Sequence, residues 1–145
     1  MEFGEFINKY TDTKVDYDGV YGAQCVDLFR QYCNDVLQIP HTGSCSTTGG
    51  AKDLFLDYEK MPLEKKYFKK ITYPFKTFSN FSYGDVVVWN SNENNKYGHV
   101  AIFVANLKDS ILVFEQDGFK QNGARLRIRS KNNILGILRF KGEIK

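Results

Sequence analysis

Twelve residues near the start of the chain, from Asp16 to Asp27, contain a candidate cation loop. Asp16 and Asp18 are spaced like the first two side-chain ligands of a twelve-residue calcium loop, and Asp27 falls at its last position. The backbone carbonyls of Val20 and Gly22 fall at the next alternate positions. These donors are all hard oxygens, which favour Ca²⁺ over zinc or copper. The alternative is that the acidic residues are solvated turn formers.

Cys25 lies inside this loop and is the candidate nucleophile. It directly precedes a run of apolar residues at three- and four-residue steps, which predicts a helix with one buried face. These apolar residues are Leu28, Phe29, Tyr32, Cys33, Val36 and Leu37. A cysteine at the start of a helix feels the positive end of the helix dipole, which favours thiolate over thiol.

A cysteine nucleophile needs a base, and the chain has two histidines, His41 and His99. His41 lies in a Ser/Thr/Gly-rich segment with the composition of a loop. His99 begins the apolar run His-Val-Ala-Ile-Phe-Val and would be held rigidly at the start of a strand, as a general base should be. The alternative for His99 is a polar residue that caps a strand end.

The imidazole base needs an acceptor that fixes its tautomer and stabilises its cation. If residues 99–105 and 111–115 form a hairpin, Glu115 comes to lie beside His99. Asp117 is two residues further on and shares the same face if the strand continues. Either carboxylate could orient the imidazole, and both could also be ordinary acidic residues at a strand end.

Three further side chains have competing interpretations. Cys33 is expected to be a small core residue on the buried helix face. Cys45 is either an exposed bystander or a residue that borders the cleft with His41, and a zinc cluster of Cys33, His41 and Cys45 lacks recognised spacing. Trp89 ends an apolar run and either walls a substrate groove or anchors the core.

The elements that would position these residues change in kind near Met61. Besides the Cys25 helix, residues 3–10 and 51–58 have the pattern of short helices. Later runs predict strands at residues 85–89, 99–105, 111–115, 125–129 and 134–140, whereas residues 67–73 are ambiguous. Turn residues separate the strands and favour hairpins in an antiparallel sheet of five or six strands. The expected fold class is α+β, with the helices packed on one side of the sheet.

Length and composition restrict the classes of protein to consider. The 145 residues predict one domain, residues 1–145, without a secretory signal or a membrane-spanning helix. Residues 1–60 carry 5 Lys/Arg against 10 Asp/Glu, and residues 61–145 carry 15 against 7. The basic part could attract a polyanion such as nucleic acid or an anionic wall polymer, although solvated strand faces account more simply for most of its charges.

Four motifs together resemble the CHAP domain family, the cysteine, histidine-dependent amidohydrolases/peptidases of the papain-like NlpC/P60 group. They are Asp-x-Asp-Gly-x-x-x-x-Gln-Cys-x-Asp-Leu (16–28), Tyr-Gly-Asp-Val-Val-Val-Trp (83–89), Gly-His-Val-Ala-Ile-Phe-Val (98–104) and Phe-Glu-Gln-Asp (114–117). The resemblance covers roughly Phe6 to Phe140. The acidic loop most resembles that of the calcium-binding CHAP domains of phage endolysins.

The resemblance implies a papain-like fold and a role for each site residue. Cys25 corresponds to the nucleophile, His99 to the base and Glu115 to the group that orients the imidazole. Family members often have Asn where this chain has Asp117, so the role of Asp117 stays open. The implied oxyanion donors are the backbone N–H of Cys25 and Gln24. The implied Ca²⁺ ligands are Asp16, Asp18, Val20, Gly22 and Asp27.

The implied activity is hydrolysis of an amide bond in peptidoglycan, by an amidase or endopeptidase that forms a thioester. The expected partner is bacterial peptidoglycan, with no nucleic acid, no membrane insertion and a monomeric enzyme. The protein would be made in the host cytoplasm and reach the wall after holin-dependent release, or act as part of a larger protein. The alternatives are a non-catalytic wall- or partner-binding module and a cysteine hydrolase of a small amide.

Overall fold

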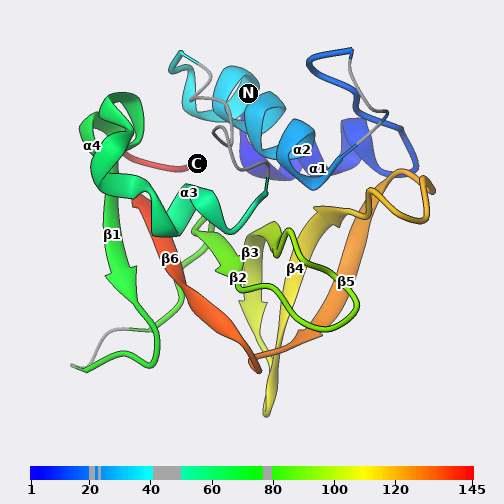
Figure 1. Cartoon of the computed structure of the whole chain (residues 1–145). Coiled ribbons are helices and arrows are strands. Elements are labelled where there is room, and N and C mark those ends of the chain that lie inside the picture. Colours follow the sequence, from blue (N-terminus) through cyan, green and yellow to red (C-terminus); the bar gives the residue numbers. More distant parts are fainter. Residues whose placement is uncertain (20–21, 23, 41–49, 77–79) are drawn as a thin grey trace.

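Six antiparallel strands form one sheet, in the order β1-β6-β2-β3-β4-β5 (Figure 1). The computed structural model describes residues 1–19, 22, 24–40, 50–76 and 80–145. The strands are β1 (Phe68–Thr72), β2 (Val86–Trp89), β3 (His99–Asn106), β4 (Ser110–Gln116), β5 (Ala124–Ser130) and β6 (Ile134–Phe140). The predicted α+β class and the strand number are confirmed, and the ambiguous segment 67–73 contains β1.

The helices precede the strands along the chain, as the sequence predicts. They are α1 (Phe3–Tyr10), α2 (Cys25–Tyr32), a π-helical segment (Cys33–Leu37), α3 (Asp53–Leu56), a 3₁₀ turn (Tyr58–Lys60) and α4 (Pro62–Tyr67). The sequence analysis missed α4, which is short. Its signals are Pro62 at the first helical position, Glu64 in the first turn and two lysines in the last turn.

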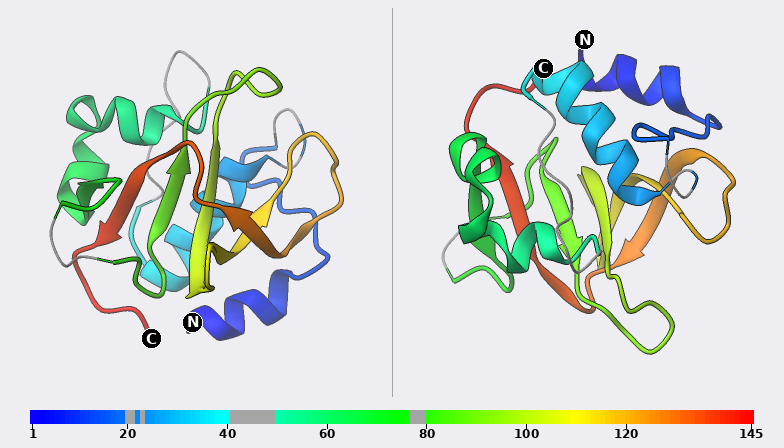
Figure 2. Two further views of the ribbon diagram at one scale, coloured as in Figure 1. Left: turned by 90° about the horizontal axis from the view of Figure 1, so that it is seen from below. Right: turned by 45° about the horizontal axis from the view of Figure 1, so that its top comes forward.

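The helices pack against one face of the sheet (Figures 1 and 2). Phe3 and Phe6 of α1, and Phe29 and Tyr32 of α2, belong to one buried cluster with alternate residues of the central strands. Those strand residues are Val86, Val88, Val100, Ile102, Phe114 and Leu138. Within the described part of the chain, no helix is long and apolar enough to cross a membrane.

The opposite face of the central strands is buried as well. Val87, Ala101 and Phe103 form a second cluster, in which the rings of Phe81 and Phe103 stack with centroids 5.3 Å apart. Burial on both faces explains why β2 is a continuous apolar run rather than an alternating one. It also makes the start of β3 a rigid place for a functional side chain.

Candidate active site

The N-terminus of α2 places Cys25 at the first helical position. Gln24 is the N-cap, and its backbone N–H donates to Asp27 Oδ2 at 2.9 Å. This bond is one half of a capping box, in which each of the two side chains accepts the backbone N–H of the other residue. The Asp27 carboxylate therefore caps the start of α2 and also belongs to the acidic loop. The cap fixes the first turn of α2, in which Cys25 is half-buried.

His99 is the first residue of β3 and is paired in register with Trp89 of β2. Gly98, with φ +75°, precedes it, and a Cβ there would lie 2.5 Å from the carbonyl oxygen of Trp89. Glycine is therefore required for the close approach of the two strands. The indole of Trp89 lies beside the imidazole, with ring centroids 5.6 Å apart.

The imidazole of His99 lies between a thiol and a carboxylate. Its Nε2 is 3.1 Å from Glu115 Oε1, and it also forms a hydrogen-bonding contact with Cys25. Burial lowers the pKa of His99, but the contacts with Cys25 and Glu115 outweigh burial and raise the pKa to about 9. The positively charged imidazole is thus favoured at neutral pH, as a thiolate–imidazolium pair requires.

Glu115, on β4, is completely buried and ionised. Arg129 of β5 donates from Nε to Oε1 at 2.7 Å and from Nη2 to Oε2, and Arg127 Nε lies 3.7 Å from Oε2. Burial alone would raise the pKa of Glu115, but Arg129 and His99 lower it to about 2. The sequence analysis did not identify Arg129 as a site residue.

Asp117 lies just beyond the end of β4, and its carboxylate is directed to its own turn. Its Oδ1 accepts the backbone N–H groups of Phe119 at 2.8 Å and Lys120 at 3.3 Å. Of the two carboxylates considered from the sequence, Glu115 is the one that contacts His99, whereas Asp117 borders the groove. The strand pairing that would have placed Asp117 opposite His99 ends before it.

Gln116 connects the site to the acidic loop and was also missed from the sequence. Its buried side chain bonds both ends of the loop: Nε2 donates to the carbonyls of Val15 at 2.7 Å and Gln24 at 2.8 Å, and Oε1 accepts the N–H of Val15 at 2.7 Å. One side chain from β4 therefore holds the backbone both before the acidic loop, at Val15, and next to Cys25, at Gln24.

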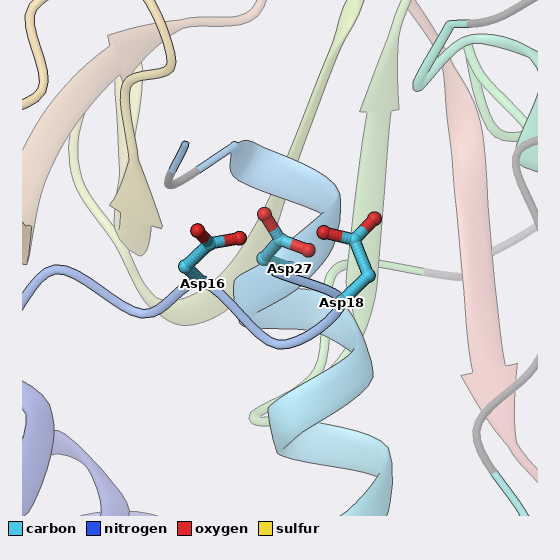
Figure 3. A group of neighbouring side chains, drawn as sticks. All are labelled: Asp16, Asp18 and Asp27. Atoms are coloured by element: carbon cyan, nitrogen blue, oxygen red, sulfur yellow. The ribbon is translucent and has the colours of Figure 1, made fainter. Parts of the chain in front are cut away.

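The acidic loop brings Asp16, Asp18 and Asp27 together at the start of α2 (Figure 3). One oxygen from each carboxylate lies within 4.8 Å of the others, so the described donors fit a hard cation. Burial and the nearby Asp18 raise the pKa of Asp27 to about 6. Arg30 Nη1 lies 3.1 Å from Asp18 and 3.4 Å from Asp27 and supplies part of the balancing charge.

Other predicted residues have different outcomes. Val20, His41 and Cys45 lie outside the described residues, and no contact of the Gly22 carbonyl is described. Cys33 is fully buried in the core cluster, as expected. Trp89 is 8% exposed, donates from Nε1 to the Ser130 carbonyl at 3.2 Å and also lines the groove, so it is packed in the core and borders the groove at the same time.

A groove of about 840 Å³ runs past the thiol and the imidazole between the flanking loops. Cys25 and His99 lie along it with Trp89, and Arg129 contributes to its wall. Two aromatic side chains on the groove are exposed: Tyr97 by 42% and Phe119 by 69%. The arrangement is a thiol beside an imidazole held by a buried anion, in an open groove that can admit a polymer.

Comparisons with known proteins agree with this geometry. The family model described as the CHAP domain matches residues 14–117. The endolysin PlyTW of Staphylococcus phage Twort is 33% identical over 99 residues, which are 67% of this chain and 18% of that protein. A D-alanyl-L-alanine endopeptidase of Streptococcus phage B30 is 29% identical over 102 residues, covering 70% of this chain and 21% of that protein. The chain thus spans about a fifth of these relatives.

Solved structures show the same fold. The wild-type endolysin LysIME-EF1 has a TM-score of 0.70 at 20% sequence identity, with 96% of this chain and 64% of that chain covered. Ly7917 has a TM-score of 0.66 at 17% identity, with 97% of this chain and 63% of that chain covered. Its structure with the hydrolysing product of MDP has a TM-score of 0.58 at 16% identity, with 82% and 54% covered.

Proposed function

This chain belongs to the CHAP domain family, and from that premise we propose that it hydrolyses peptidoglycan as a cysteine amidase or endopeptidase. The observation that carries the proposal is the contact series from Cys25 through His99 to the buried Glu115 at the groove. The relative named as a D-alanyl-L-alanine endopeptidase supports an amide bond of the stem peptide or cross-bridge as the target.

The geometry supports a proposed role for each residue in acyl transfer. An ionised carboxylate only accepts hydrogen bonds, so Glu115 requires a proton on His99 Nε2 and leaves Nδ1 for the thiol of Cys25. Nδ1 takes the thiol proton to form the thiolate–imidazolium pair, and the thiolate of this pair attacks the carbonyl carbon of the substrate. His99 then gives the proton to the leaving amine, and water hydrolyses the thioester with His99 again as base.

The start of α2 is suited to the oxyanion. The first N–H groups of a helix have no partner within the helix, so the N–H of Cys25 is a candidate donor to the tetrahedral intermediate. Gln24 borders the groove beside it and is the second candidate. We place Trp89 on the groove wall, where it would limit the movement of both His99 and the substrate.

Ca²⁺ is the cation we propose for the acidic cluster, with Asp16, Asp18 and Asp27 as side-chain ligands. The donors are carboxylate oxygens on a loop, which suit the larger and less strictly coordinated Ca²⁺ better than Mg²⁺. A bound Ca²⁺ and the nearby Arg30 would together balance the three carboxylates, and the cation would stiffen the segment before Cys25. The carbonyls of Val20 and Gly22 complete the proposed ligand set.

The proposed setting follows from the relatives, which come from bacteriophages. We propose that the protein is made in the host cytoplasm and acts on the wall from inside, after holin-dependent release or as part of a larger lytic protein. Its proposed partner is peptidoglycan, and it acts as a monomer.

Purified cell walls test the function directly. The protein should reduce their turbidity, and mass spectrometry should show new amino and carboxyl ends in the released muropeptides. Cys25→Ser should abolish cleavage because a hydroxyl is a much weaker nucleophile than an activated thiolate, whereas Cys33→Ser, in the core, should retain it. Unchanged lysis by Cys25→Ser, or no new amide-derived ends with the wild-type protein, contradicts the proposal.

A further inference from the structure

Arg129 holds Glu115 through a two-point contact from the edge strand β5. Both carboxylate oxygens receive an N–H of the same guanidinium, a geometry that fixes the plane of the carboxylate as well as its charge. We propose that Arg129 is a positioning residue, which keeps Glu115 ionised and oriented so that Glu115 selects the working tautomer of His99. The proposal rests on the hydrolase function proposed above.

Burial makes Glu115 dependent on a cation. A fully buried carboxylate without a partner takes up a proton or moves toward water, because its charge is poorly solvated. Arg127 is too far from Oε2 for a hydrogen bond, at 3.7 Å. Arg129 is therefore the arginine whose N–H groups replace the lost hydration of Glu115.

The protonation state of Glu115 decides which ring nitrogen of His99 is free. An ionised Glu115 requires a proton on Nε2. In the neutral ring Nδ1 therefore keeps the lone pair that accepts the Cys25 proton. A protonated Glu115 could donate to Nε2 instead, which would place the neutral ring's proton on Nδ1. That tautomer has no lone pair toward the thiol and cannot act as its base.

The same contact sets the direction of the imidazole. Oε1 of Glu115 accepts from Arg129 Nε at 2.7 Å and lies 3.1 Å from His99 Nε2. Rotation of the carboxylate away from the imidazole would also break both bonds to the guanidinium. A lysine could supply the charge but not the two parallel donors.

Arg125 provides a matched control on the same strand. It is the register partner of Glu115, yet its Nη2 donates to the Asn122 carbonyl at 3.0 Å and to Asp12 at 3.4 Å. It lies on the same strand face as Arg129, because the two are four residues apart. Loss of a positive charge from this face can therefore be separated from loss of the contact with Glu115.

Kinetics on purified walls test the role of Arg129. We expect Arg129→Gln to lower kcat at least ~10-fold with KM within about 2-fold, and Arg125→Gln to stay within about 2-fold of wild type. In a Glu115→Gln background, Arg129→Gln should cost less than about 2-fold more, because coupled residues are non-additive. Three results would overturn the proposal: a double-variant loss equal to the product of the two single losses, a change confined to KM, or an equal loss of kcat in Arg125→Gln.

Arg129→Lys keeps the test decisive if Arg129→Gln fails to fold. It retains the positive charge and loses the fork, so we expect a kcat between those of wild type and Glu115→Gln. A wild-type kcat in Arg129→Lys would show that charge alone suffices and would refute the orienting role. Thermal melting of each variant establishes that the folded protein is being measured.

Imidazole ¹⁵N spectra give a readout that needs no substrate. They are recorded on Cys25→Ser protein above the titration of His99, with His41→Gln to assign the two histidines. We expect the Nε2–H tautomer in the Cys25→Ser and Cys25→Ser/Arg125→Gln proteins, and the Nδ1–H form to appear when Arg129→Gln is added; Arg129→Lys, which keeps the charge, should show less of that form. An unchanged tautomer refutes the role of Arg129, even if the walls are cleaved; absence of wall cleavage refutes the hydrolase proposal and leaves this result standing.

Discussion

Replacing Glu115 by Gln removes the buried anion of the site while keeping its shape. The pKa of Glu115 falls from 4.5 to about 2 on folding, and each pKa unit corresponds to about 1.4 kcal/mol, so its charge contributes about 3 kcal/mol to stability at neutral pH. Breaking a buried ion pair commonly costs about 3–5 kcal/mol, which agrees. For a domain of this size we expect the melting temperature to fall by about 10 °C.

The pH dependence of this loss has a defined sign. The folded-state pKa is depressed, so the stabilisation is complete above about pH 4.5 and disappears as the pH falls toward 2. Melting curves of wild type and Glu115→Gln should therefore be far apart at pH 7 and converge in acid. Wall turbidity at pH 7 should fall at least ~10-fold more slowly with the variant, because the imidazolium loses its anion.

Glu59→Gln is the control for this substitution. Glu59 is 72% exposed and pairs with Lys65 at the surface, where an ion pair contributes less than about 1 kcal/mol. Its melting temperature should therefore stay within a few degrees of wild type. Equal melting of Glu115→Gln and wild type at pH 7 would refute the description of Glu115 as a buried, paired anion.

Three other substitutions test neighbouring parts of the site. Asp117→Asn should retain wall-lytic rates within about 3-fold, since an amide oxygen can accept the same turn N–H groups. A loss as large as that of Glu115→Gln would give Asp117 the orienting role. Asp18→Ala should abolish Ca²⁺ binding in calorimetry and the rise in melting temperature with Ca²⁺, and the cation site is wrong if wild type shows neither. Gly118→Ala places a Cβ 2.2 Å from Gln24 Oε1 and should slow lysis about 10-fold by displacing a candidate oxyanion donor, whereas Gly4→Ala, with nothing within 4 Å, should not; equal rates in both would remove Gln24 from the mechanism.

Local patterns in the sequence were sufficient for most of the fold. Helical spacing located α1 and α2, and turn residues divided the later chain into the strands that the structure contains. The hairpin argument also brought His99 and Glu115 together, because adjacent antiparallel strands meet in a register that short turns restrict. These features depend on residues close in sequence, so one chain is enough to predict them.

The arginines of β5 show where such patterns fail. Alternation of Arg with Leu and Ile favours buried aliphatic residues and solvated arginines, yet Leu126 is 46% and Ile128 is 67% exposed. The arginines share the face of Glu115, whose buried charge is paired with Arg129. Glu115 and Gln116 face opposite sides of β4: Glu115 meets Arg129 of the next strand, whereas Gln116 bonds Val15, 101 residues earlier, which no local spacing indicates.

The side-chain bonds of Gln116 also determine when the site can exist during synthesis. They join β4 to Val15, 101 residues earlier, and Ala124 pairs with the backbone of Asp12 and Thr13 just upstream. The segment before the nucleophile can form these bonds only after the ribosome has released β4 and β5. Closing such long loops is slow compared with forming a helix. A chain that ends before β4 therefore carries Cys25 and His99 without Glu115, Arg129 or the bonds of Gln116.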